Sequence, residues 1–328
     1  MAKHLVAALV AAICLATAAS SPAAATAYTM TDLGSLGYGV SVGFAINSSG
    51  EVVGRSYLAK TFTFTCGRHT CRFTQNDPFS WSADVISDLG TLNPRAMSEA
   101  TGINNLGDVV GGSNGEAILV HNGALSDLGT GTAYGINDFR EIVGASAQRA
   151  FIISGGARTT LPDLSSYGYS SASGINNNHE IVGSSDTVGG YSNAVMWRNG
   201  AITDLGTLGG TQSAASAINS LGQVVGWAHT ASEATHVFLW QNGTMADLGV
   251  FGLDPVANAI NNRGVVVGQS DTGAWIWMSG RFQNLNNLVP AGTGFTIEAA
   301  TAINDNGQIV ANGRNAQGQE HAFLLNPN

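Results

Sequence analysis

The most constraining feature of this chain is a motif that recurs seven times. Ile-Asn is followed by a turn and a Val/Ile pair in INSSGEVVG, INNLGDVVG, INDFREIVG, INNNHEIVG, INSLGQVVG, INNRGVVVG and INDNGQIVA. The motif asparagines are Asn47, Asn104, Asn137, Asn176, Asn219, Asn261 and Asn304. Their spacings run from 33 to 57 residues and centre on about 43, the length of one supersecondary unit. The chain is therefore expected to fold as an array of similar units.

Each repeat contains the signals of four short strands. After the Val/Ile pair comes an apolar strand such as HVFLW, then a pair such as Asn242-Gly243, then a strand that ends in Asp-Leu-Gly. Asn-Gly pairs favour the positive φ angles of a type I′ hairpin turn. In HVFLW, Phe238 and Trp240 alternate with two other apolar residues, so both faces of this strand need cover. Sheets stacked face to face would provide that cover.

These features predict an all-β fold, a seven-bladed β-propeller of four-stranded antiparallel blades that forms one domain over residues 28–328. The repeat region opens with YTMTDLG and stops at HAFLLNPN, each inside a repeat. Together the two partial repeats make one full unit, so we expect the N-terminal strand to pair with the C-terminal strand and close the ring. The rival architecture is a β-solenoid, which would need atypical capping repeats at its ends.

The segments HAFLL, HVFLW, DLGTLGG and INSLGQVVG resemble the bacterial extracellular HAF-repeat family, named for its His-Ala-Phe motif. The resemblance covers essentially all of residues 28–328 and is weakest at EAILV and RAFII, in the second and third repeats. This family has no assigned activity. The resemblance therefore implies export and a repeat architecture, and it supplies no catalytic residues.

Residues 1–27 have the form of a cleavable signal peptide. Lys3 and His4 precede an apolar run, and small residues lead to a cleavage site before Tyr28. The mature chain should then be secreted or periplasmic, without a membrane span. The excess of 22 Asp and Glu over 13 Lys and Arg disfavours nucleic acid as a partner.

Cys66 and Cys71, in CGRHTC, are the two cysteines beyond the predicted signal peptide. Disulfides persist in exported compartments, so we predict that these two cysteines pair. Free thiols fit export poorly, and half of a zinc site would need a second pair of ligands with suitable spacing.

Loop lengths distinguish the two faces of the predicted ring. The turns between first and second strands, and between third and fourth strands, are tight and share one face. The other connections vary in length and share the opposite face, here called the variable-loop face, where binding residues are expected. Its largest insertion is a hairpin at about residues 55–77 with Arg68 and His69 near the tip. This hairpin is either a contact arm for an anionic or polymeric partner or a solvated insertion.

The candidate binding residues are mainly aromatic side chains that could stack on sugar rings. They are Tyr38, Tyr167, Tyr169, Tyr191 and Trp227, together with Arg68 and His69. Trp227 directly follows a strand and equally fits packing between blades. Because the Asp of Asp-Leu-Gly and the Asn of the Ile-Asn motif recur in the repeats, we expect them to bond local turns rather than act in catalysis. The sequence predicts no cofactor and no metal site.

The sequence favours a non-enzymatic, exported scaffold that binds an extracellular or cell-surface partner, with a glycan as one candidate. The alternative is a polysaccharide lyase or glycoside hydrolase on the same face. Its candidate catalytic residues would be Glu99, Glu233, Glu298 and His229, whose separations the sequence does not give. A third reading, a structural component of a bacterial surface layer, predicts self-association.

Overall fold

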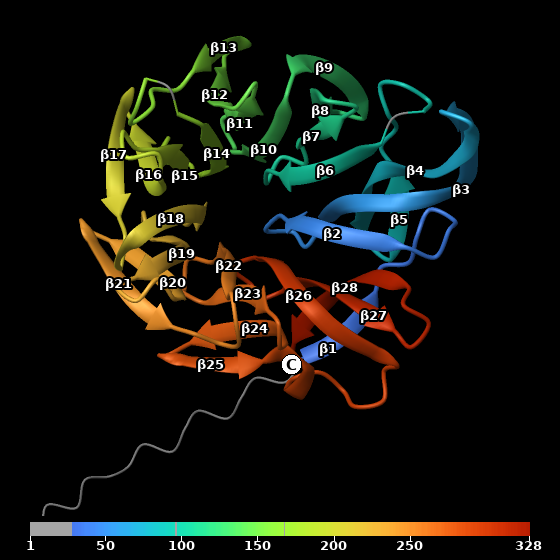
Figure 1. The fold of residues 1–328 in the computed structure, drawn as a ribbon. Helices are drawn as coiled ribbons and strands as arrows, with labels where there is room; N and C mark the ends of the chain where they lie inside the picture. The colour runs from blue at the N-terminus through green and yellow to red at the C-terminus, as the bar shows by residue number, and fades with distance from the viewer. Residues whose placement is uncertain (1–27, 96, 167) are drawn as a thin grey trace, which may run out of the picture.

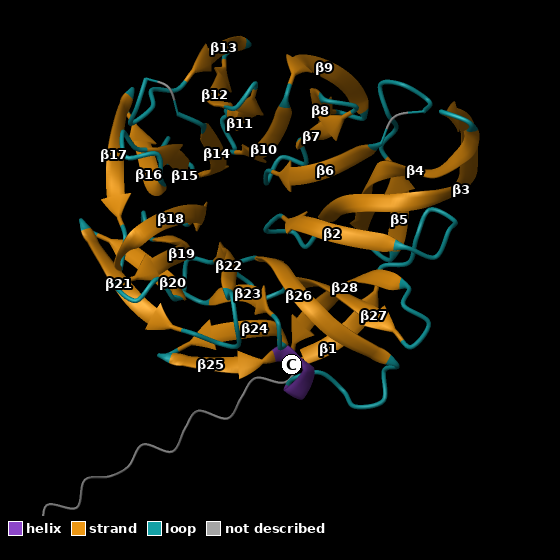
Figure 2. Cartoon of the chain, in the orientation of Figure 1, coloured by secondary structure: helices purple, strands orange, loops and turns teal. Residues whose placement is uncertain are grey.

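The computed structural model describes residues 28–95, 97–166 and 168–328. Strands dominate these residues, and the helix among them is one short 3-10 turn, η1 (Leu285–Asn287), as Figure 2 shows. The sheets are arranged around a common centre, each running outward from it (Figure 1). In the described part of the chain, no helix is long and apolar enough to cross a membrane. The predicted signal peptide, 1–27, lies outside the described residues.

Each group of four strands runs from the centre to the rim. The innermost strands are β2 (Ser41–Ile46), β6 (Ser98–Ile103), β10 (Thr132–Ile136), β14 (Ser170–Ile175), β18 (Gly209–Ile218), β22 (Val256–Ile260) and β26 (Phe295–Ile303). The second strands are β3 (Val52–Cys66), β7 (Val109–Ser113), β11 (Ile142–Ser146), β15 (Ile181–Asp186), β19 (Val224–Thr230), β23 (Val266–Ser270) and β27 (Ile309–Asn315). The third strands are β4 (His69–Ser82), β8 (Glu116–His121), β12 (Arg149–Ser154), β16 (Ser192–Arg198), β20 (Thr235–Gln241), β24 (Gly273–Met278) and β28 (Glu320–Pro327). The outer strands are β5 (Val85–Asp88), β9 (Ala124–Thr130), β13 (Ala157–Thr160), β17 (Ala201–Gly206), β21 (Thr244–Gly249), β25 (Arg281–Asn284) and β1 (Tyr28–Asp32).

All pairs of named strands are antiparallel, and an isolated bridge between Leu208 and Thr230 is parallel. Five are separate four-stranded sheets, such as β2-β3-β4-β5. The remaining eight strands form one sheet, in which β22–β25 and the group β26-β27-β28-β1 meet through the single pair Gln269 and Ala299. The predicted all-β architecture of four-stranded antiparallel sheets is confirmed.

The turns between third and outer strands have the predicted conformation. In Asn122-Gly123 and Asn199-Gly200, for example, both residues have positive φ, between 50° and 78°. Such angles match the right-handed twist of the flanking strands. The first group uses Ala83 and Asp84 in the same conformation, which the sequence did not indicate.

The glycine that follows the Val/Ile pair is required by close contact between strands. A Cβ atom on Gly226 would lie 2.0 Å from the Ala214 carbonyl oxygen and 2.9 Å from the Phe238 ring. Absence of a side chain at this position therefore lets the apolar third strand pack its aromatic residue against the second strand.

Among the described residues the core forms seven apolar clusters, and each lies between two successive four-strand groups. One of them joins the last group to the first, through residues such as Leu324 and Ala322 on β28 and Val52 and Phe79 on β3 and β4. Phe79, Phe238 and similar third-strand residues are almost fully buried, as two-sided cover requires.

The N-terminal strand completes the C-terminal group. β1 pairs antiparallel with β28, and the register runs from Tyr28 opposite Pro327 to Asp32 opposite Phe323. This is the pairing expected from the two partial repeats. The Nδ1 atom of His321 also lies 2.8 Å from the Asp32 carboxylate.

The motif asparagines join neighbouring groups as well as their own turns. In each motif, Oδ1 accepts backbone N–H groups two and four residues ahead, as for Asn304 with Asn306 and Gln308. The predicted turn role is thus confirmed. In addition, each Nδ2 donates to the backbone carbonyl of the next motif asparagine, and the seventh, Asn304, donates to Asn47 at 3.0 Å.

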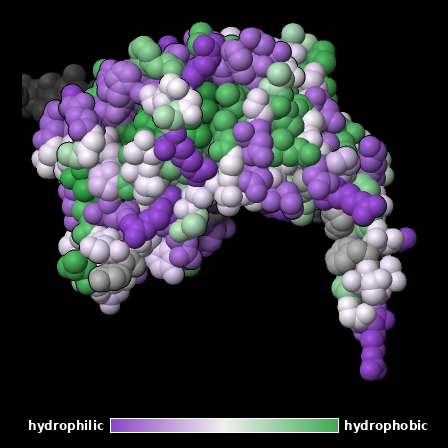
Figure 3. Space-filling model, turned by 90° about the horizontal axis from the view of Figure 1, so that it is seen from above, coloured by the Kyte–Doolittle hydropathy of each residue, from purple (hydrophilic) through white to green (hydrophobic). Residues whose placement is uncertain are grey.

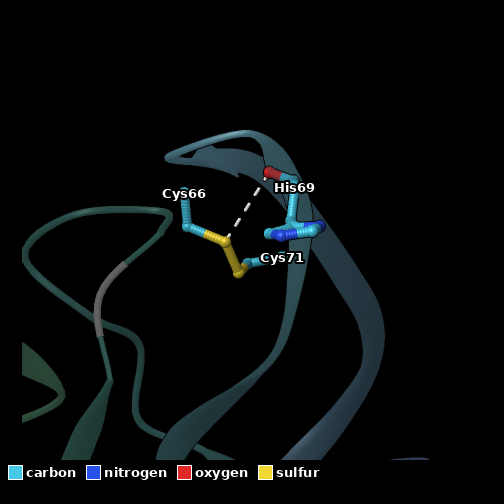
Figure 4. The surroundings of a disulfide bond; sticks show 3 residues. All are labelled: Cys66, His69 and Cys71. Atoms are coloured by element: carbon cyan, nitrogen blue, oxygen red, sulfur yellow. Dashed lines mark hydrogen bonds between the residues drawn. A yellow bond between two sulfur atoms is a disulfide. The ribbon is translucent and has the colours of Figure 1, made fainter.

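The predicted insertion is an extended hairpin made by β3 and β4. The pairing is irregular between Tyr57 and Thr61, where the arm leaves the body of the sheet, and continues to Cys66 opposite His69. Figure 3 shows the molecule edge-on, with this arm projecting from one face and a hollow beside it. The predicted Cys66–Cys71 disulfide is present at the tip (Figure 4). His69 is exposed there, and its carbonyl oxygen lies 3.6 Å from the Cys66 sulfur.

Candidate functional site

One position of every innermost strand faces the centre of the molecule. A β-bulge interrupts the pairing of each innermost strand with its second strand, three residues before the motif asparagine. A bulge leaves one residue unpaired and redirects its side chain. The bulged residues are Phe44, Thr101, Tyr134, Ser173, Ser216, Asn258 and Thr301, and all except Ser216 line a central cavity of about 350 Å³.

Three of these residues have a structural role. The hydroxyl of Thr101 donates to the Ala133 carbonyl at 2.6 Å, across the boundary between two groups. Thr301 and Asn258 make equivalent bonds to the next innermost strand. Phe44 and Tyr134 occupy the equivalent bulge position. Their aromatic rings line the cavity rather than bond to the neighbouring group.

Two other cavities lie next to one another on the variable-loop face, and one of them borders the central cavity. A cavity of about 530 Å³ shares Tyr134 and Ser171 with the central one. A further cavity of about 390 Å³ shares Gly115 and Thr132 with the second. We call these three neighbouring cavities the groove.

The tyrosine end of the groove is lined by Tyr134, Tyr169 and the turn residue Gln148, with several serine and threonine residues. The two tyrosines are 38% and 55% exposed, so part of each ring is open to a ligand. Asp186 fixes the Tyr169 loop, because its carboxylate accepts the Tyr169 backbone N–H at 3.1 Å.

The polar end of the groove is built by Arg55, Asn76 and Glu99. An Arg55 N–H donates to the Glu99 carboxylate at 2.9 Å, and the guanidinium lies 5.5 Å from the centre of the Phe44 ring. Asn76 is buried and donates from Nδ2 to the Ser98 carbonyl at 2.7 Å. Beside it on β4, burial raises the pKa of the Asp77 carboxyl, an effect that the Gln75 amide partly offsets.

The four residues considered for catalysis divide between separate places. Glu99 lies in the groove and pairs with Arg55. Glu233 accepts from the Thr211 hydroxyl at 2.7 Å, which lowers its pKa, and lies 3.0 Å from His229. Glu298 pairs with Arg314 at 3.0 Å on β26 and β27. Within the described residues, no group of three or more His, Cys, Asp or Glu side chains could hold a metal ion.

The aromatic candidates also separate. Tyr169 lies in the groove, and Tyr191 is exposed next to Ser192, which lines it. Tyr38 is exposed in the loop between β1 and β2. Trp227 is half-buried on β19 with its ring 5.3 Å from that of His229.

Two further candidates lie away from the groove. Arg68 and His69 are exposed at the arm tip, away from the groove residues. Tyr167 lies outside the described residues.

Sequence reasoning missed Phe44, Tyr134, Arg55 and Asn76. A signal for the first two was present, because the residue three positions before the motif asparagine is small and polar in five repeats and aromatic in FAIN and YGIN. Arg55 and Asn76 carried no comparable signal, since both lie in the unrepeated hairpin.

The Asp-Leu-Gly aspartates cap turns, as predicted. Asp32, Asp88, Asp127, Asp204 and Asp247 each accept the backbone N–H of the glycine two residues ahead, at 2.7 to 2.9 Å. The histidine of the His-Ala-Phe motif, which had no predicted partner, lies against the same aspartate in the pairs His236–Asp247 and His321–Asp32.

The opposite face carries a smaller central cavity of about 280 Å³. It is lined by the isoleucine, the asparagine and the following residue of all seven motifs. Most of these polar groups bond one another between neighbouring four-strand groups, as when Ser48 N–H donates to Asn105 and Asn105 N–H to Asp138. This face has turns of nearly uniform length.

The fold and groove define a propeller-like, all-β protein. No family model and no curated protein matches the sequence. Among solved structures, the chain is similar to the extracellular domain of a one-component system from B. thetaiotaomicron, with 11% identity and a TM-score of 0.56 over 92% of this chain and 40% of that chain. It is also similar to a chain of the mitotic checkpoint complex, with 12% identity and a TM-score of 0.56 over 99% of both chains. At these identities the similarity shows the fold alone.

Proposed function

We propose that this protein is an exported, closed seven-bladed β-propeller that binds carbohydrate in the groove of its variable-loop face. The closed ring is supported by three sets of contacts. They are the seven groups of four strands, the seven apolar clusters between these groups and the seven asparagine bonds. The β1–β28 pairing and the bond from Asn304 to Asn47 join its ends.

The observation that carries carbohydrate binding is the composition of the groove. Phe44, Tyr134 and Tyr169 present aromatic surface, and hydroxyl, amide and charged groups surround them. A sugar has apolar C–H faces and many hydroxyls, so it needs both kinds of surface in one concave site. Phe44 and Tyr134 occupy the bulge position at which other repeats have a residue that bonds to the adjacent group. These two side chains therefore contribute to the groove rather than to the contacts that close the ring.

Export and family membership are part of the proposal. The form of residues 1–27, the Cys66–Cys71 disulfide and the likeness to an extracellular domain support secretion or a periplasmic location. The segments HAFLL, HVFLW, DLGTLGG and INSLGQVVG support placing the chain among the bacterial HAF-repeat proteins.

The enzymatic alternative has less support. A glycosidase needs two carboxyl groups at a defined separation on either side of one bond. Glu99, Glu233 and Glu298 lie in three different groups, and each is engaged by a neighbouring cation or hydroxyl.

The test is binding to a panel of soluble polysaccharides and oligosaccharides, measured by calorimetry. We expect at least one to bind wild-type protein and Tyr134→Ala to weaken it about tenfold, since stacking on an aromatic ring is worth about 1 kcal/mol or more. Phe139→Ala is the matched control. Phe139 is a 62% exposed aromatic residue that follows the same strand, β10, in the turn on the opposite face.

Equal loss of binding in the Tyr134 and Phe139 variants would contradict the placement of the site. Absence of binding to every glycan in the panel would contradict the proposed function itself. A bound polysaccharide that is cleaved by wild-type protein and not by Glu99→Gln would establish the enzymatic alternative.

A further inference from the structure

We propose that the polar end of the groove is a subsite for a neutral sugar, in which Arg55 and Asn76 bind one ligand hydroxyl. This inference rests on the proposed function and names the ligand chemistry of that site. Two buried polar atoms without a protein partner carry it.

The two atoms are Oδ1 of Asn76 and Nε of Arg55. Asn76 is 2% exposed, and its Nδ2 is already engaged by Ser98, while its Oδ1 accepts no hydrogen bond. Arg55 uses Nη1 for Glu99, while its buried Nε has no acceptor. A buried polar group without a partner costs about 1–3 kcal/mol. Both atoms have less than 1 Å² of accessible surface, so a ligand reaches them after a small rotation of the two side chains and then recovers that energy.

The strand register places both side chains in the same cavity. On β3 and β4, Arg55 is opposite Pro78, and Asn76 is opposite Tyr57 two residues further along, so the two lie diagonally on one face of the sheet. Both line the 390 Å³ cavity with Glu99, which belongs to the neighbouring group. The hairpin arm begins at this point, so its base forms one wall of the subsite.

The donor and acceptor pattern identifies the chemical class. Nε of Arg55 needs an acceptor and Oδ1 of Asn76 needs a donor, and a hydroxyl group is both. The Glu99 carboxylate can accept from a second, adjacent hydroxyl while it keeps its bond to Arg55. A pair of neighbouring hydroxyls, as on a hexose ring, matches this set.

Charge argues against ionic ligands at this end. A uronate carboxylate could accept from Arg55 Nε, but it would leave Asn76 Oδ1 without a donor and would face the Glu99 carboxylate. An amino sugar's ammonium group could donate to Asn76 Oδ1, but it would leave Arg55 Nε without an acceptor and would face the guanidinium. Because Arg55 and Glu99 neutralise each other at 2.9 Å, the subsite favours an uncharged group.

The neighbouring ring explains how a sugar would reach these atoms. The Phe44 ring lies beneath the Arg55 guanidinium and lines the adjoining central cavity. A hexose in contact with Phe44 within the central cavity would have hydroxyls near Arg55.

The experiment combines one protein variant with altered ligands. Arg55→Lys keeps the positive charge for Glu99 and removes the planar Nε donor. Its matched control is Arg158→Lys, because Arg158 is also an arginine over an aromatic ring, 3.7 Å from the centre of Phe151, and does not line the groove. Wild type and both variants are titrated with neutral polymers, with polyuronates and with monodeoxy analogues of the neutral sugar that binds.

We expect wild type to bind a neutral sugar, Arg55→Lys to weaken that binding about tenfold or more, and Arg158→Lys to leave it unchanged. With wild type, one monodeoxy analogue should bind more weakly than the parent sugar by a similar factor. With Arg55→Lys, the same analogue should bind almost as tightly as the parent sugar does. This ligand-side comparison holds even where the variant is less stable.

Three outcomes would contradict the proposed subsite. Preferential binding of polyuronates contradicts the predicted ligand class, and equal affinity of wild type and Arg55→Lys contradicts the role of Nε. Both leave the proposed function intact if Tyr134→Ala still weakens binding. Absence of any glycan binding overturns both proposals.

Discussion

The side-chain amide of Asn304 donates to the backbone carbonyl of Asn47 at 3.0 Å and joins two residues 257 positions apart. The same bond links every other motif asparagine to its successor over 33 to 57 residues. One sequence feature therefore shapes the local turn through Oδ1 and connects neighbouring groups through Nδ2.

Replacing Asn304 with alanine should reduce stability substantially. The change removes two donated and two accepted hydrogen bonds of a buried side chain and leaves the Asn47 carbonyl with the Gly50 N–H as its donor. We expect a loss of about 2–4 kcal/mol in the free energy of unfolding by denaturant titration. Asn176→Ala should lose a similar amount, because its bonds are equivalent. A much smaller loss at Asn304 would show that the first and last groups are not joined in this way.

Asp108 should stabilise the protein near neutral pH. Burial opposes ionisation of Asp108, but hydrogen bonds from His121, Asn104 and Arg140 outweigh it and hold its pKa below the ordinary value. A lowered folded-state pKa gives stability that is present above the unfolded pKa of about 3.9 and lost as pH falls through the folded value. Asp108→Asn should therefore lower the melting temperature at pH 7, and this loss should shrink as pH falls below about 4 toward the folded-state pKa of Asp108.

Asp77 should have the opposite effect. Burial raises the pKa of this carboxyl, so the stability it contributes is present below the unfolded pKa of about 3.9 and lost as pH rises through the folded value. Asp77→Asn keeps an acceptor for Gln75 and removes the buried charge. We expect a higher melting temperature than wild type at pH 7 and no gain at about pH 3. A lower melting temperature at pH 7 would mean that a further group stabilises the ionised Asp77 carboxylate.

The disulfide should hold the arm rather than the whole fold. Cys66 and Cys71 close a loop with a sequence separation of 5, so its entropic contribution is at most about 2 kcal/mol, and the arm can open without the sheets. Changing both cysteines to serine should leave the main melting transition within about 2 °C and increase proteolysis between β3 and β4. Loss of cooperative unfolding would contradict this view of the arm as a local unit.

The sequence predicted the parts of the fold that repeat. Seven Ile-Asn motifs, the Asn-Gly turns and the alternation in strands such as HVFLW indicated four-strand units, because each rests on local backbone preferences. The partner of Asn47 in the next group was not predictable in this way, since it depends on how the units are placed in space. The His321–Asp32 pair was missed for the same reason.

The candidate site was predicted less well. Tyr169 and Glu99 were identified as residues outside the repeat pattern, and both line the groove. Tyr134 was overlooked because its significance depends on the β-bulge that turns it toward the centre. Asn76 became a candidate only when its burial and its unpartnered oxygen were known.

Both proposals depend on a closed ring, and a cross-link between its ends tests this most directly. Thr29 lies opposite Asn326, and its hydroxyl is 3.4 Å from the Asn326 carbonyl oxygen. The exported double variant Thr29→Cys with Asn326→Cys should form a disulfide, seen by mass spectrometry of unreduced peptides. The control pair, Thr29→Cys with Thr160→Cys on the distant strand β13, should not. Absence of the first cross-link, or equal yield of the second, would contradict the closed ring and the face assigned to the groove.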